Sequence, residues 1–126
     1  MIRAKLLLVD DEEEFTSVLA ERLSFRNFDT RVATSGEAAL LEIEKARPDI
    51  VLLDYKMPGM DGMETLAQIK AKDPSIDVII LTGGVDREVG AESLRAGASH
   101  YVVKPVDIEI LLHKVQDITE RRGLDY

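Results

Sequence analysis

The stretch LLLVDDEEEF, residues 6–15, joins four apolar residues directly to five acidic ones. A short apolar run bounded in this way is typical of a strand in a protein core. Adjacent carboxylates at the end of such a strand repel one another, which costs free energy unless a positive charge lies nearby. The stretch therefore predicts a buried strand followed by a place where a cation is needed.

Further along the chain, short apolar runs alternate with segments of helical periodicity. The expected strands are residues 5–9, 29–33, 49–53, 76–81 and 100–103. Helices are expected at residues 12–26 and 85–95, and after Thr34, Asp61 and Asp107. Serial strand–helix units favour parallel strands, because parallel neighbours need a crossover connection. We therefore expect an α/β fold, a five-stranded parallel sheet with helices on both faces.

Capping signals mark several helix ends. Thr34 and Glu37 have the spacing of a capping box, in which Thr34 caps the helix and Glu37 reaches back. Asp61 and Glu64 have the same spacing before the third helix. Gly123 follows the last helix, and the preceding Arg121-Arg122 pair is expected to oppose the helix dipole.

Composition limits the classes of function. The chain has 126 residues, no cysteine and a net charge of −8, so we expect one domain over residues 1–126 without disulfide or thiolate chemistry. No stretch approaches the ~20 apolar residues that span a bilayer, which predicts a cytoplasmic protein without a membrane partner. The dispersed basic residues argue against nucleic-acid binding through this domain.

Polar residues end the predicted strands. In parallel sheets ligands bind beyond the carboxyl ends of the strands, so these residues form the candidate site. They are Asp10, Asp11, Asp54, Thr82 and Lys104. Oxygen ligands of this kind suit Mg²⁺, and a lysine ammonium can hold phosphoryl oxygens. The sequence thus predicts a Mg²⁺ site that can also receive a phosphoryl group.

These features resemble the receiver domain of response regulators in bacterial two-component signalling. Four motifs carry the resemblance in order: Asp10-Asp11, LLDYKMPGMDG (52–62), IILTGG (79–84) and YVVKP (101–105). The similarity covers essentially the whole chain. It implies a flavodoxin-like (βα)5 fold with strand order 2-1-3-4-5.

The resemblance also implies a phosphoacceptor and a metal site. Asp54 would take a phosphoryl group from a phosphohistidine, and Lys104 would neutralise the phosphoryl oxygens. Asp11, Asp54 and the backbone carbonyl of Lys56 would bind Mg²⁺ directly, whereas Asp10 would reach it largely through water. Such a domain catalyses only its own phosphoryl uptake and slow hydrolysis, and is a signalling switch rather than an enzyme.

A switch and two partner surfaces follow from the same resemblance. The hydroxyl of Thr82 would move onto the phosphoryl group, Tyr101 would turn inward behind it, and the Lys104–Pro105 bond would be cis. A histidine kinase or histidine phosphotransfer protein would dock near Phe15 and Val18. The fourth helix, fifth strand and fifth helix would form an output face, suited to self-association, that includes Asp86, Glu88, Glu92, Arg95 and Tyr101.

Two other functions remain open at this level. One is a Mg²⁺-dependent phosphohydrolase with Asp54 or Asp10 as the nucleophile, although such enzymes usually have an Asp-x-Asp pair on the first strand. The other is a receiver-like binding module that acts without phosphorylation. The cognate kinase and the output stay open, as does the choice between a stand-alone receiver and part of a longer regulator.

Overall fold

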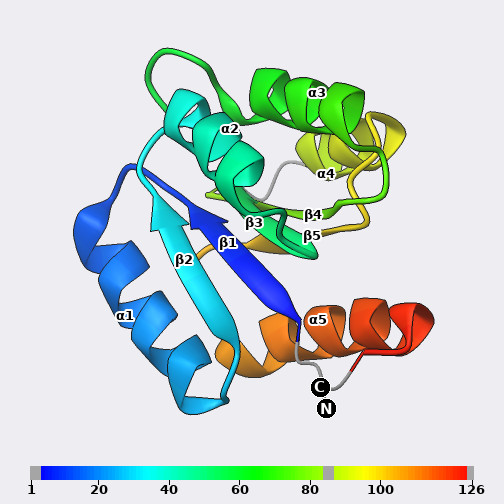
Figure 1. The fold of residues 1–126 in the computed structure, drawn as a ribbon. Coiled ribbons are helices and arrows are strands. Elements are labelled where there is room, and N and C mark those ends of the chain that lie inside the picture. Colours follow the sequence, from blue (N-terminus) through cyan, green and yellow to red (C-terminus); the bar gives the residue numbers. More distant parts are fainter. Residues whose placement is uncertain (1–3, 84–86, 125–126) are drawn as a thin grey trace.

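A parallel β-sheet forms the centre of the molecule (Figure 1). The computed structural model describes residues 4–83 and 87–124. The strands are β1 (Lys5–Val9), β2 (Asp29–Ala33), β3 (Ile50–Asp54), β4 (Asp77–Thr82) and β5 (His100–Val103). Their order across the sheet is β2-β1-β3-β4-β5, and every neighbouring pair is parallel. The expected fold class and strand order are confirmed.

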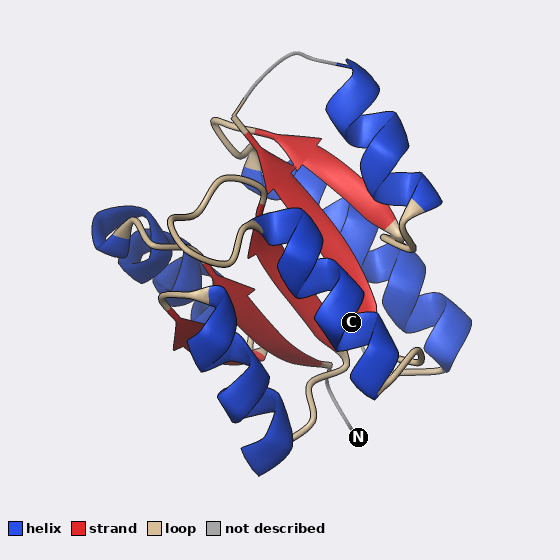
Figure 2. Cartoon of the chain, turned by 90° about the horizontal axis from the view of Figure 1, so that it is seen from above, coloured by secondary structure: helices blue, strands red, loops and turns tan. Residues whose placement is uncertain are grey.

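Helices cover both faces of this sheet, as the view from above shows (Figure 2). They are α1 (Glu13–Phe25), α2 (Gly36–Lys45), α3 (Gly62–Lys72), α4 (Arg87–Arg95) and α5 (Ile108–Arg122). Helices α1 and α5 lie on one face, and α2, α3 and α4 lie on the other. Within the described residues, no helix has both the length and the apolar character needed to cross a membrane.

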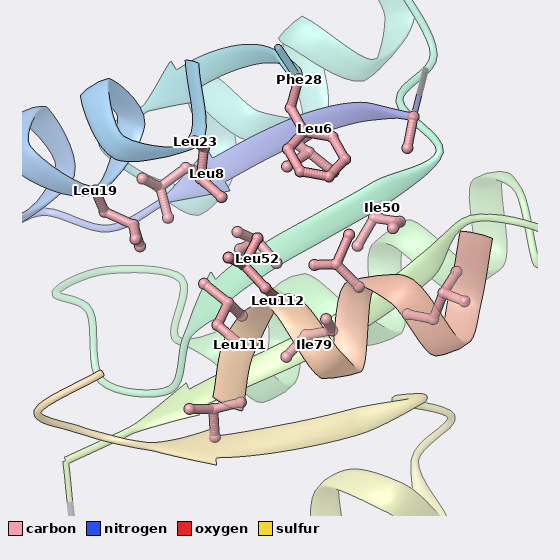
Figure 3. Close-up of a cluster of buried hydrophobic side chains, with 14 of the residues drawn as sticks. Leu6, Leu8, Leu19, Leu23, Phe28, Ile50, Leu52, Ile79, Leu111 and Leu112 are labelled. Atoms are coloured by element: carbon pink, nitrogen blue, oxygen red, sulfur yellow. The ribbon is translucent and has the colours of Figure 1, made fainter. Parts of the chain in front are cut away.

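Two apolar cores result from the alternation of side chains along each strand. Leu6 and Leu8 of β1 point into the first core, together with residues of α1 and α5 (Figure 3). Leu7 and Val9 point into the second core, beneath α2 and α3. Strands β1, β3 and β4 are apolar on both faces because each face is covered, as in other parallel sheets.

Some element boundaries differ from the sequence-based expectation. Strands β3 and β4 each lie one residue further along the chain than predicted. The second helix is capped by Ser35 and not by Thr34, since the Ser35 hydroxyl accepts a hydrogen bond from the amide of Ala38. Glu37 does not reach back to the cap, because its carboxylate accepts the amide of Met60 from the β3–α3 loop instead.

Helix α1 begins and ends one residue inside its predicted bounds, and the predicted start of the fourth helix at residue 85 lies outside the described residues, whereas three other predicted ends are confirmed. Asp61 caps α3 by accepting the amide of Glu64, and Asp107 caps α5. Gly123 ends α5 in the left-handed conformation with φ 71°. Arg122 does more than oppose the dipole of α5, because its Nε lies 2.7 Å from the carboxylate of Asp77 at the start of β4. This ion pair joins the end of α5 to the amino edge of the sheet.

Candidate functional site

The carboxyl ends of β1 and β3 bring the predicted acidic residues together. Val9 and Leu53 are register partners in the sheet, so the residues that follow them, Asp10 and Asp54, lie side by side. Asp10 and Asp54 are both buried, with 0% and 4% of their surface exposed, whereas Asp11 is exposed. One oxygen from each of the three carboxylates lies within 4.8 Å of the others.

Lys104 reaches this cluster from the end of β5. Its ammonium lies 2.8 Å from Asp10, 3.2 Å from Asp54 and 3.5 Å from Glu12. Its backbone amide donates to the carbonyl of Thr82, which holds the end of β5 against the end of β4. The Lys104–Pro105 peptide bond is cis, as the resemblance implied. The sequence therefore identified a lysine that contacts both buried aspartates.

The charges of the cluster are not balanced. Burial and the neighbouring Asp10 carboxylate raise the pKa of Asp54 to about 6, and Lys104 only partly opposes them. Burial alone would lower the pKa of Lys104, but its hydrogen bond to Asp10 and the charge of Asp54 outweigh this, so its pKa is raised. Three carboxylates converge here, and the single positive charge of Lys104 cannot compensate all three.

The donor set fits a divalent cation of the hard type. Three carboxylate oxygens converge, and oxygen ligands are those that Mg²⁺ prefers. Asp10 does not cap α1, whose N-cap residue is Glu12; one of its oxygens accepts a hydrogen bond from Lys104 and the other accepts one from the amide of Glu12. The structure thus brings the three predicted carboxylates together, and their role as metal ligands stays a prediction. The assignment of the Lys56 carbonyl as a further ligand stays a prediction.

Thr82 and Tyr101 occupy neighbouring strands beside the cluster. Thr82 is the buried last residue of β4. The residue before it, Leu81, is the register partner of Asp54 on β3. Tyr101 lies on β5, partly buried against the second core. Thr82 therefore lies beside the end of β3, and Tyr101 lies on the next strand on the side of the second core, while their roles as a switch stay predictions.

The Tyr101 ring packs against α4 at Gly90, where the helix has no side chain. A Cβ atom built on Gly90 would lie 2.5 Å from Cζ of Tyr101 and 2.6 Å from Cε1, closer than real Cβ contacts. The ring therefore lies directly against the backbone of α4. Sequence reasoning missed Gly90, because a glycine within a helical pattern gives no indication of which distant side chain packs on it.

We expect Gly90→Ala to move the Tyr101 ring away from α4 and toward solvent, because the added methyl group needs the volume that the ring occupies. In 3-fluorotyrosine-labelled protein, the ¹⁹F resonance of Tyr101, assigned by Tyr101→Phe, should shift toward that of an exposed tyrosine. An unchanged resonance in a folded variant would contradict this. Gly83→Ala serves as control, since a Cβ atom there would meet nothing within 4 Å.

Gly62 is a second residue that sequence reasoning missed, although it ends the quoted motif LLDYKMPGMDG. A Cβ atom on Gly62 would lie 2.4 Å from the backbone oxygen of Asp54 and 2.7 Å from Cα of Tyr55. The amide of Gly62 also donates to the carbonyl of Tyr55. The first residue of α3 thus packs on the backbone of the phosphoacceptor candidate.

Two grooves flank the site at the surface. The first has a volume of about 250 Å³ and lies between α1 and the β5–α5 loop, where Phe15, Val18 and Pro105 are among its lining residues. The second, of about 470 Å³, lies over α4, β5 and α5 and includes the exposed side chains of Leu94 and Ile110. The family resemblance implied partner surfaces at both places, and the binding of partners there stays a prediction. Asp86 lies outside the described residues.

Comparison with known proteins agrees with this geometry. The family model for the response regulator receiver domain matches residues 6–116. Sporulation initiation phosphotransferase F of Bacillus subtilis is 40% identical over 109 residues, covering 86% of this chain and 88% of that protein. Regulatory protein AtoC of Escherichia coli is 36% identical over 107 residues, which cover 85% of this chain and 23% of AtoC. Several curated relatives are thus about four times as long as the matched segment.

Solved structures give the same result. The receiver domain of the Francisella response regulator 1452 superimposes with a TM-score of 0.89 at 28% identity, covering 95% of this chain and 99% of that one. A CheY-like receiver domain protein from Methanospirillum hungatei gives 0.88 at 30% identity, covering 96% and 98%. From its motifs, its strand order and these matches, the chain belongs to the response regulator receiver domain family of two-component systems.

Proposed function

We propose that Asp54 accepts a phosphoryl group from a phosphohistidine of a partner protein and that the resulting acyl phosphate switches the domain. The contact of Lys104 with both buried aspartates, at 2.8 and 3.2 Å, is the observation that carries this proposal. A carboxylate oxygen of Asp54 forms the new bond to phosphorus as the bond from phosphorus to the histidine nitrogen breaks. The histidine leaves as imidazole and takes up a proton.

The residues around Asp54 have distinct tasks in this transfer. Lys104 neutralises the charge on the phosphoryl oxygens, because phosphoryl transfer depends mainly on positioning and on compensation of charge. Asp10, Asp11 and Asp54, with the Lys56 carbonyl, would hold Mg²⁺, which supplies further positive charge when bound. The Thr82 hydroxyl then donates to the phosphoryl group, and Tyr101 moves into the space behind Thr82.

Intact-mass measurement tests the proposal. The protein is incubated with acetyl phosphate and Mg²⁺, beside Asp54→Asn and a sample without metal. One added phosphoryl group that is absent from both controls is the expected result. An adduct on Asp54→Asn would overturn the assignment of the acceptor. Release of many equivalents of phosphate per protein from a generic phosphate ester would favour the phosphohydrolase instead.

The partners follow from the same proposal. A histidine kinase or phosphotransfer protein docks at the groove beside α1, where Val18 is half exposed. A charged substitution at Val18 should then block transfer from that partner.

The output face over α4, β5 and α5 includes the exposed residues Glu88, Glu92 and Arg95. Unchanged self-association of the phosphorylated protein after Arg95→Glu would count against pairing through this face.

Binding of nucleic acid is not part of this proposal. Some relatives are named transcriptional regulatory proteins, and this chain matches 26% of the length of one of them. The expectation that this domain itself does not bind nucleic acid stays a prediction.

A further inference from the structure

Phe15, in the first turn of α1, lies under the ammonium group of Lys104. The Nζ atom is 4.6 Å from the centroid of the ring, which is within the range of a cation–π interaction. The ring is partly buried and packs against the first core, so the core limits its movement. The face of Phe15 is therefore a fixed surface for the charge that serves Asp54.

Three carboxylates compete for the same ammonium. Asp10, Asp54 and Glu12 all lie within 3.5 Å of it, and Asp10 is the nearest. A lysine side chain has many rotamers, and it would follow whichever carboxylate attracts it most. An aromatic face attracts the ammonium without accepting a hydrogen bond from it, so the ring limits its position and leaves its protons for oxygen acceptors.

We propose that Phe15 is a positioning residue that keeps Lys104 directed at the phosphoryl group on Asp54. This inference rests on the proposed function and concerns a residue outside the acidic cluster. Before transfer, the ring holds the ammonium between the aspartates. After transfer, Lys104 exchanges a carboxylate contact for phosphoryl oxygens and stays over the same ring.

The first experiment compares phosphoryl uptake from acetyl phosphate with Mg²⁺, which needs no docked protein. Phe15→Leu keeps an apolar side chain but removes the π face, and uptake should fall roughly two- to fivefold, as expected for a partly exposed cation–π contact. Phe15→Tyr should restore the rate. Phe25→Leu is the matched control, because Phe25 is an exposed phenylalanine at the far end of the same helix, and its uptake should equal that of the unmodified protein.

A series of fluorinated phenylalanines separates the electrostatic role from packing. Each added fluorine weakens the negative face of the ring with little change of shape, so uptake should fall stepwise from 4-fluoro- through 3,5-difluoro- to 3,4,5-trifluorophenylalanine at position 15. The affinity for beryllofluoride with Mg²⁺, a stand-in for the phosphoryl group, should weaken in the same order. If Phe15 acted only through packing, uptake and beryllofluoride affinity would not fall in the order of increasing fluorine number.

The outcomes distinguish the two proposals. If the unmodified protein takes up no phosphoryl group and binds no beryllofluoride, the proposed function fails. If it does both, while Phe15→Leu and the fluorinated series match it, the positioning role of Phe15 is overturned. Uptake that falls equally in Phe15→Tyr and Phe15→Leu would also overturn it, since the aromatic face would then have no part.

Discussion

Asp54→Asn is expected to raise the free energy of unfolding by about 1–3 kcal/mol at pH 7.5 in the absence of Mg²⁺. The pKa of Asp54 is about 6 in the folded protein because of burial and the Asp10 carboxylate, against 3.8 for an ordinary aspartate. The ionised side chain therefore destabilises the fold. The amide of asparagine has a similar shape and no charge, so it removes this penalty.

The pH dependence has a definite sign. The pKa of Asp54 is higher in the folded protein than in the unfolded chain, so folding favours the protonated side chain. The stability that this gives is fully present below pH 3.8 and is lost as the pH rises through about 6. The advantage of Asp54→Asn should thus be greatest above pH 7 and shrink as the pH falls toward 4.

Urea unfolding of both proteins between pH 4 and 8 measures this difference. Asp11→Asn is the control. Because the Asp11 carboxylate is exposed, its replacement should raise the free energy of unfolding by less than Asp54→Asn does. Added Mg²⁺ should stabilise the unmodified protein more than Asp54→Asn, since the ion would need the Asp54 carboxylate. A difference that does not change with pH would contradict the assignment of the penalty to ionised Asp54.

Gly62→Ala is expected to lower the free energy of unfolding by about 2–3 kcal/mol, in the upper part of the range for overpacking. The new methyl group would meet the backbone of Asp54 and Tyr55 at 2.4 to 2.8 Å. Backbone atoms in β3 cannot rotate away as a flexible side chain can. The β3–α3 loop must shift instead, and the carboxylate of Asp54 shifts with it.

Two measurements test the effect of Gly62→Ala. Thermal and urea unfolding should show the loss of stability, and phosphoryl uptake by the protein that stays folded should also fall. Gly83→Ala is again the control, because a Cβ atom there meets nothing within 4 Å and stability should change little. Equal stability of the two variants would show that the loop adapts without cost.

The succession of strands and helices and the centre of the site were predictable because both depend on local patterns, whereas the strand order was implied by the family resemblance alone. Apolar runs followed by Asp10, Asp54 or Lys104 identify strands and the residues at their carboxyl ends, and parallel strands place those ends together. The sequence could not decide between Thr34 and Ser35 as a cap, because both residue types cap helices well. Strand bounds shifted because pairing with neighbours, not local composition, determines where a strand ends.

The residues that were missed depend on contacts between distant segments. Gly62 and Gly90 matter through backbone and ring atoms that approach them after folding. The contact between Phe15 and Lys104 joins residues far apart in the chain, and Phe15 alone fits the pattern of a core residue. Arg122 likewise fits a helix end, and only the folded chain shows its ion pair with Asp77.

The two separate cores have a consequence for divergence among duplicated copies of such a domain. Each strand residue belongs to one core, so a substitution that repacks the α1 face leaves the packing beneath α2 and α3 unchanged. The packing under α1 and α5 and the packing under α2 and α3 can therefore change independently after duplication. The carboxyl edge of the sheet is shared by both faces, so the site residues there are constrained by the same chemistry in every copy.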